Sequence, residues 1–279
     1  MTRRLWTGPA IAAVLVGIGA PPAHAADAPD NSLAEAVVAP NERVFSAFIA
    51  AGAGVAPEYE GADTYKAIPF AIANIKWRGL ELQLRGLQAR LDIAGDSPWD
   101  FGPVVNRRGK RDDDVKGPVG RLNEIDAAIE VGGFAGYRFG GAEHGQGEIG
   151  VEATFLHDVS DTHDGFTASA GLSYAALRWG RVFANADARA TFASKDYNRT
   201  YFGVTRAESG ISGLAPYRPG SGLKDVGAGL TVGYQLNEQW GVLARASLTR
   251  FVGDAADSPV VKSGSATAGL FGLGLSYRY

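Results

Sequence analysis

Two polar clusters contain side chains of the types that bind metal ions. His157, Asp158, Asp161, His163 and Asp164 crowd one short segment. Imidazole and carboxylate groups are good ligands for divalent cations. A solvated polar loop explains the same composition, and we favour that interpretation over a metal site.

The second cluster is the acidic run Asp112, Asp113 and Asp114, which lacks the ligand spacing of an EF-hand. Four basic residues come just before it: Arg107, Arg108, Lys110 and Arg111. We therefore interpret this stretch as a solvated loop whose charges neutralise one another.

Sequence signatures of catalysis are missing. Ser221 lies between Gly220 and Gly222 without forming a G-x-S-x-G elbow, and there is no H-E-x-x-H motif or P-loop. The chain has no cysteine, which excludes a disulfide, a thiolate metal site and a cysteine nucleophile. We predict a protein that is not an enzyme and has no catalytic residue, no bound metal and no cofactor.

A third set of charged residues recurs on the polar side of alternating segments. If these segments form a closed wall, the charges face one interior, where they must pair or be hydrated. A salt-bridged filling of the interior is our preferred interpretation, because small barrels fill with side chains; a polar conduit is the alternative. The set comprises Glu124, Asp126, Glu130, Arg138, Glu148, Glu152, Asp187, Arg189 and Arg245.

The elements that carry these charges have a period of two residues. In the last segment Phe271, Leu273, Leu275, Tyr277 and Tyr279 alternate with small or polar residues. Such alternation is typical of a soluble sheet with one wet face and of a membrane barrel with a polar lumen. The segments run to 11–16 residues, which suits tilted strands that cross a bilayer. We predict an all-β fold, a transmembrane antiparallel up-and-down β-barrel.

Eleven strand-like segments can be recognised, whereas bacterial barrels usually have an even number of strands. Strands counted forward from residue 44 and backward from residue 279 give numbers that disagree by one crossing. The disagreement falls within residues 80–123. We place the hidden strand in 80–93, with a break near Gly86, and predict twelve strands, with ten as the alternative. The long segment 194–225 should then be an external loop. The segments are near 44–55, 65–77, 80–93, 99–107, 124–139, 147–157, 166–178, 181–192, 226–236, 240–251 and 265–279.

The N-terminus has the pattern of a secretory signal peptide, residues 1–25, with cleavage between Ala25 and Ala26. Residues 26–43 are rich in Ala, Pro and acidic residues, and we expect a flexible periplasmic leader. The barrel domain is then 44–279, in the outer membrane of a Gram-negative cell. The formal net charge of −3 gives no sign of nucleic-acid binding.

At the other end, the aromatic carboxy-terminal strand resembles the signal that the outer-membrane assembly machinery reads. Its proposed recognition residues are Phe271, Leu273, Leu275, Tyr277 and Tyr279. The partners expected on these grounds are that machinery and the lipid of the outer membrane.

An ordered set of short motifs is similar to the MipA/OmpV family of MltA-interacting outer-membrane proteins. Lys110 is a departure, since an arginine is expected after Gly109. The motifs are Gly54-Val55-Ala56-Pro57-Glu58-Tyr59-Glu60-Gly61, Gly102-Pro103-Val104-Val105 with Arg108-Gly109-Lys110-Arg111, Ile125-Asp126-Ala127-Ala128-Ile129-Glu130-Val131-Gly132-Gly133-Phe134, Tyr201-Phe202-Gly203-Val204, and Asp257-Ser258-Pro259-Val260-Val261.

The resemblance implies a closed outer-membrane barrel without established catalytic residues. It also implies a scaffold that joins the lytic transglycosylase MltA to a penicillin-binding protein in murein synthesis. A small polar pore, or a role in osmotic response or antibiotic susceptibility, is the alternative. A scaffold should use the periplasmic side, the leader 26–43 and the short turns, whereas a pore needs a continuous hydrated lumen.

Overall fold

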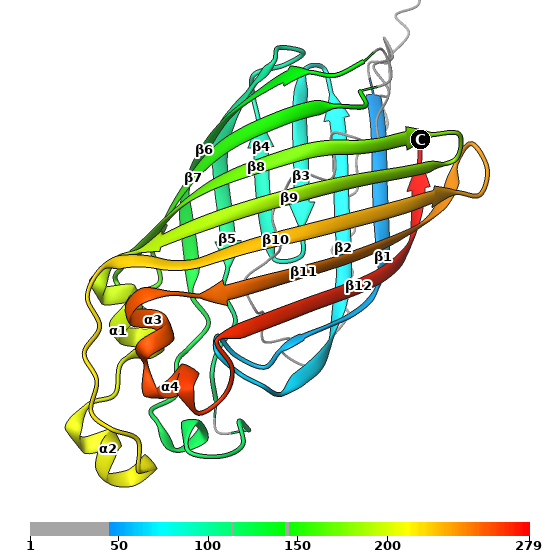
Figure 1. Cartoon of the computed structure of the whole chain (residues 1–279). Coiled ribbons are helices and arrows are strands. Elements are labelled where there is room, and N and C mark those ends of the chain that lie inside the picture. The colour runs from blue at the N-terminus through cyan, green and yellow to red at the C-terminus, as the bar shows by residue number, and fades with distance from the viewer. Residues whose placement is uncertain (1–44, 113, 143–144) are drawn as a thin grey trace, which may run out of the picture.

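The computed structural model describes residues 45–112, 114–142 and 145–279, which form a closed barrel of twelve antiparallel strands (Figure 1). Each strand pairs with its neighbours in the chain, and β12 closes the barrel on β1. The predicted fold class and strand number are confirmed. The proposed signal peptide, its cleavage between Ala25 and Ala26, and the leader 26–43 lie outside the described residues.

The strand bounds place the hidden crossing in the predicted segment. A hairpin of two short strands, β3 and β4, turns at Gly86, whose φ of 55° favours glycine. The strands are β1 Phe45–Pro57, β2 Tyr65–Trp77, β3 Leu80–Arg85, β4 Gln88–Asp92, β5 Trp99–Arg107, β6 Ile129–Gly140, β7 Glu148–Asp158, β8 Phe166–Trp179, β9 Val182–Ala193, β10 Gly222–Gln235, β11 Trp240–Phe251 and β12 Thr267–Arg278.

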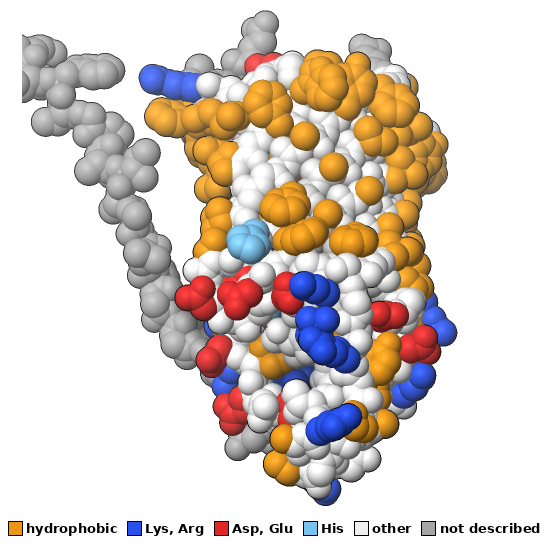
Figure 2. All heavy atoms as spheres, turned by 90° about the vertical axis from the view of Figure 1, so that its left-hand side faces the viewer, with side chains coloured by type: hydrophobic (Ala, Val, Ile, Leu, Met, Phe, Trp, Pro, Cys, Tyr) orange, Lys and Arg blue, Asp and Glu red, His pale blue; other side chains and the backbone are white. Residues whose placement is uncertain are grey.

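The alternation of residues puts apolar side chains on the outside of the wall. In β12, Phe271, Leu273 and Leu275 are exposed, whereas Gly272, Gly274 and Ser276 between them are buried. Figure 2 shows the resulting apolar belt, with charged side chains gathered beyond one edge of it. A soluble sandwich would bury this face, so the pattern is that of a barrel whose outer face meets lipid.

Aromatic side chains mark the two edges of the apolar belt. Phe45 packs edge-on to Tyr279 near the chain ends, and Trp240 packs against Tyr277 in the same rim. At the opposite edge Phe166 stacks between Phe155 and Phe192. Aromatic girdles at both interfaces are a feature of outer-membrane barrels. We call the rim with Phe45 and Tyr279 the terminal end and the other rim the loop end.

Short helices occupy the loop end, where the sequence predicted loops without regular structure (Figure 1). No helix among the described residues is long and apolar enough to cross a membrane. The helical pattern was missed because each helix lasts only one or two turns. They are η2 Val119–Arg121, α1 Lys195–Phe202, α2 Arg206–Ser212, α3 Gly253–Asp257 and α4 Pro259–Lys262.

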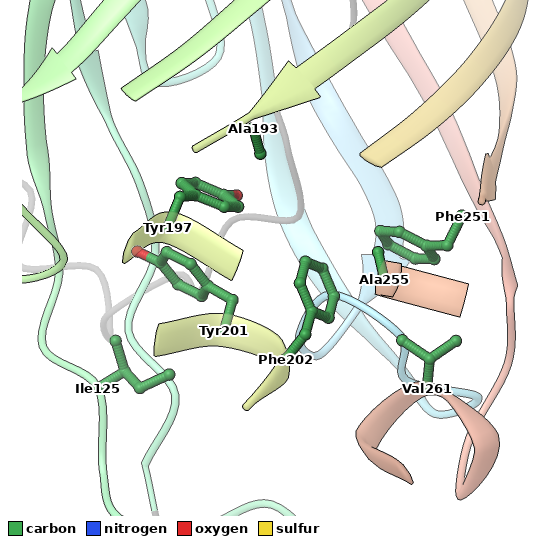
Figure 3. Close-up of a cluster of buried hydrophobic side chains, with 8 residues drawn as sticks. All are labelled: Ile125, Ala193, Tyr197, Tyr201, Phe202, Phe251, Ala255 and Val261. Carbon is green, nitrogen blue, oxygen red and sulfur yellow. The ribbon is translucent and has the colours of Figure 1, made fainter. Parts of the chain in front are cut away.

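Helix α1 anchors the loop end to the barrel. Ser194 caps it by accepting a hydrogen bond from the Tyr197 backbone N–H. Tyr201 lies one turn after Tyr197, so the two rings share one side of the helix. Figure 3 shows them beside Ile125, while Phe202 turns toward Phe251 and Val261. The loops therefore pack on each other around a core of their own.

Candidate functional site

The most extensive polar site lies inside the barrel near the loop end, and Glu130 is at its centre. Glu130 is fully buried on β6 and points inward. Its carboxylate accepts hydrogen bonds from Asn106 Nδ2 at 2.7 Å and from Arg108 Nε and Nη2, both at 3.1 Å. A buried carboxylate requires this number of donors to offset its loss of hydration.

His163 completes the surroundings of Glu130. Its Nδ1 accepts a hydrogen bond from the Gly165 backbone N–H at 3.1 Å, so Nε2 carries the hydrogen and donates to Glu130 at 3.2 Å. The ring also meets Tyr197 and Tyr201 edge-on. His163 is therefore buried, not part of a solvated loop. Among the described residues no three ligand-type side chains cluster as a metal site.

A second carboxylate, Glu60, is bound to the same arginine from the loop between β1 and β2. Glu60 Oε1 accepts from Arg108 Nη1 at 3.2 Å, from Lys224 Nζ at 2.8 Å and from the Tyr197 hydroxyl at 2.8 Å. Lys224 also pairs with Asp225 at 2.9 Å. We call Glu60, Arg108, Glu130, His163, Tyr197 and Lys224 the loop-end lock. It joins strands β6 and β10, helix α1 and three loops.

Two further ion pairs lie on the inner face of the wall below the lock. Arg245 binds both oxygens of Asp187, at 2.8 and 3.0 Å, and also donates to Thr231. Arg90 pairs with Glu152 and lies over the Phe134 ring, 3.6 Å from its centre. Planar guanidinium groups suit such two-point binding of carboxylates.

An apolar layer also fills the lumen, which the sequence-based interpretation of a polar interior missed. Phe48, Ala50, Phe70, Ile72 and Leu243 are buried together, with Phe183 packed against them. Gly272 makes room for this layer, because a Cβ there would lie 2.4 Å from the Phe70 ring. The signal was present in the sequence as inward-phase aromatics on β1 and β2.

The nine charged residues singled out from the sequence do not form one network. Glu130 belongs to the lock, while Glu152, Asp187 and Arg245 belong to the two pairs below it. Arg138 pairs separately with Asp100, at 2.9 Å. Sequence reasoning missed five members of these ion pairs. Glu60 and Arg108 lie in loops, and Arg90 lies in the short β3–β4 hairpin. Asp100 and Lys224 lie on β5 and β10, to which the sequence analysis assigned no interior charge.

The remaining four residues have different places. Glu124 and Asp126 are exposed and precede β6, because that strand begins at Ile129 and not at residue 124. Glu148 begins β7, and its charge acts on Arg178. Arg189 lines a cavity of about 50 Å³ together with Asp187, Arg245 and Glu60. That volume has room for a few water molecules.

The terminal end is the second candidate surface. Its turns are short, and its strands end in exposed aromatics such as Trp77, Trp179 and Trp240. Lys76 forms an ion pair with Asp96 beside the first turn. The proposed recognition residues of β12 lie along the wall that ends here, with Leu275 and Tyr279 exposed.

Comparisons with known proteins agree with this architecture. A family model described as "MltA-interacting protein MipA" matches residues 49–279. Outer membrane protein Omp26La of Vibrio anguillarum is 27% identical over 213 residues, which are 75% of this chain and 78% of that protein.

Two shorter or more distant likenesses are also found. The MltA-interacting protein of Escherichia coli (strain K12) is 33% identical over 86 residues, 31% of this chain and 34% of that protein. The translocator domain of autotransporter NalP from Neisseria meningitidis has a TM-score of 0.42 and 13% identity, over 85% of this chain and 88% of that one.

Proposed function

Because the chain belongs to the MltA-interacting protein MipA family, we propose that it is a non-catalytic scaffold for murein-synthesising and murein-hydrolysing enzymes. The protein is an outer-membrane β-barrel. In such barrels both termini and the short turns face the periplasm, so the terminal end faces the murein layer and the loop end faces outside. The proposed partners are a lytic transglycosylase of the MltA type and a penicillin-binding protein.

The filled lumen is the observation that carries this proposal. The loop-end lock, two ion pairs and an apolar layer lie one beneath another inside the wall. A barrel filled in this way is rigid, and its rims are the surfaces left for function. The name of the Escherichia coli relative, MltA-interacting protein, supports the choice of partner.

The small cavity favours the alternative function, a polar pore, to a limited extent. It provides hydrated space beside Asp187, Arg189 and Arg245. However, the lock lies above it and the apolar layer below. Conduction would require both to move, so we place the scaffold first.

Binding of purified enzymes to the full mature chain in bilayer nanodiscs tests the scaffold. We expect the lytic transglycosylase to bind the folded barrel and to bind much more weakly to the variant Arg78→Glu/Glu238→Arg, which reverses charges in two terminal-end turns. The matched control is Arg206→Glu/Glu124→Arg at the loop end, which should bind like the wild type. Equal binding by both variants and the wild type, or no binding by the wild type, would reject the proposal.

A further inference from the structure

Ionisable side chains are rare on the outward face of the wall. Among the described strands, the positions that point outward are apolar or small almost without exception. Only Arg107 on β5, His157 on β7 and Arg250 on β11 belong to the acidic and basic residue types Asp, Glu, Lys, Arg and His. All three are basic and none is acidic, which is a marked bias in a protein with a formal net charge of −3.

These three residues occupy the same place in their strands. Each lies two residues beyond the last outward apolar side chain on its strand, after Val105, Phe155 and Leu248 respectively. Strand pairing puts them opposite residues at the loop-side limit of the neighbouring strands: Ile129 for Arg107, Phe166 for His157 and Thr267 for Arg250. We call Arg107, His157 and Arg250 the basic margin, because they follow the loop-side edge of the apolar belt.

Arg250 is the best-defined position of this margin. Its Nη1 donates to Thr267 Oγ1 at 2.8 Å, which holds the guanidinium beside β12. The Tyr65 hydroxyl lies on the same patch and accepts from the Gly269 N–H at 3.0 Å. Immediately below, Leu248 is 63% exposed and Phe271 is 49% exposed. The hydrogen-bond donors of Arg250 and Thr267 thus lie directly above a strip of exposed apolar side chains.

From this arrangement we propose that the basic margin binds the phosphate groups of outer-leaflet lipids, with Arg250 as the principal contact. An acyl chain would lie along Leu248 and Phe271 while the guanidinium and the Thr267 hydroxyl donate to the phosphate. Arginine donors match phosphate oxygens in a two-point geometry.

Snorkelling alone places long basic side chains at the edge of an apolar belt, because Arg and Lys have apolar stems that Asp and Glu lack. Arg250 has a further feature, since Thr267 holds its guanidinium beside β12, directly above the exposed Leu248 and Phe271. The opposite edge of the wall provides the comparison, since the last outward side chains of the described strands there are aromatic or apolar and none is charged, as at Trp77, Trp179 and Trp240. A margin of bases alone is what an anionic headgroup layer favours, because each base near such a layer is stabilised. This inference does not rest on the scaffold role, which concerns the opposite rim.

Lipid retention measured by native mass spectrometry tests the proposal. The full chain, folded in a neutral detergent, is titrated with bisphosphorylated lipid A, with the same lipid freed of phosphate, and with inorganic phosphate. We expect the phosphorylated lipid to bind best and Arg250→Gln to weaken its binding about five-fold, in line with the effect of one base near an anionic lipid surface. Arg250→Lys, which keeps the charge but not the two-point geometry, should bind the phosphorylated lipid more tightly than Arg250→Gln and less tightly than the wild type.

The matched control is Arg181→Gln, which removes an exposed arginine at the terminal end and should leave lipid binding unchanged. Heat-modifiable migration confirms that each variant is folded. The proposal is overturned if the dephosphorylated lipid binds as tightly as the phosphorylated one. It is also overturned if Arg250→Gln binds like the wild type, or if Arg181→Gln loses as much binding as Arg250→Gln. Competition by millimolar inorganic phosphate alone would indicate an anion site and not a lipid site, and would also reject it.

Discussion

At the scale of single residues, the loop-end lock depends on shared donors. Arg108 divides its guanidinium between Glu60 and Glu130, and its face lies 4.8 Å from the centre of the Tyr197 ring. Lys224 holds the other side of Glu60. Because each charge is buried, removal of one partner leaves the others without compensation. A substitution here therefore destabilises the barrel mainly through the buried charges that it leaves unpaired, and less through the loss of the pair itself.

We expect Glu130→Gln to destabilise the barrel by about 3–5 kcal/mol, the range for breaking a buried pair. A Gln side chain has one oxygen, so Arg108 can no longer donate to two carboxylate oxygens at position 130. The measurement is the urea midpoint of the refolded protein in lipid vesicles, followed by tryptophan fluorescence. Glu124→Gln is the control, because Glu124 is exposed, and its effect should be within about 0.5 kcal/mol. Similar midpoints for the two variants would contradict the lock.

At the scale of elements, α2 is organised by a capping box. Thr205 accepts from the Glu208 N–H at 3.2 Å, and the Glu208 carboxylate accepts from the Thr205 N–H at 2.8 Å and the Asn123 N–H at 3.2 Å. Burial of Glu208 acts to raise its pKa, but the hydrogen bonds from Thr205 and Asn123 and the charge of Arg111 outweigh it and lower the pKa. Glu208 thereby joins α2 to the loop that contains η2.

The lowered pKa of Glu208 predicts that acid loosens this connection. A carboxylate whose folded pKa is depressed stabilises the fold above its ordinary pKa, and that contribution is lost as pH falls through the folded value. Amide hydrogen exchange of α2, corrected for intrinsic rates, should therefore accelerate on acidification from neutral pH. In Glu208→Gln the protection should be weak at neutral pH already. Unchanged protection of α2 from neutral pH to acid would disprove the linkage.

The strand β12 provides an element-scale test of the lipid-facing phase. Leu273 is exposed near the middle of β12, so Leu273→Arg should cost about 2–4 kcal/mol, whereas Thr267→Arg at the margin should cost about 0–1 kcal/mol. The assay is heat-modifiable migration of membrane fractions, with folding in vesicles for the free energies. If Thr267→Arg proved the costlier of the two, the assignment of the membrane midplane would be wrong.

At the scale of the whole molecule, the filling of the lumen supports the proposed scaffold over the alternative pore. Ion pairs such as Arg245–Asp187 and the apolar layer around Phe70 both occupy the interior of the barrel. Tied strands and tied loops leave a rigid body with two distinct rims. On the proposed scaffold role, the terminal-end rim is the surface that would contact murein enzymes, and the loop-end rim would border the outer leaflet.

We expect no steady ion conductance from the wild type in planar bilayers. Phe48→Ser/Phe70→Ser should introduce conductance steps only together with Glu130→Gln, because the apolar layer and the loop-end lock both block the lumen. Phe45→Ser is the control, since Phe45 packs outside the lumen against Tyr279. Steady steps from the wild type would instead favour the polar pore.

The sequence by itself determined the barrel. Alternation has a local cause, since successive side chains of a strand point to opposite faces, and so the outward apolar phase of β12 could be predicted directly. Parity was also enough to place a strand break near Gly86, because an up-and-down barrel needs an even number of crossings. The family could be recognised from short ordered motifs that the match over residues 49–279 confirms.

Only the tertiary structure decided which charges meet. Glu60 and Lys224 are 164 positions apart in the chain, yet their side chains are 2.8 Å apart in the lock. The phase of a strand gives the direction of a side chain but not its height in the barrel, which depends on the stagger between strands. Glu124 and Asp126 were grouped with a network they do not join because β6 begins only at Ile129. The apolar layer around Phe70 was not foreseen because its members come from separate strands whose relative heights the sequence does not give.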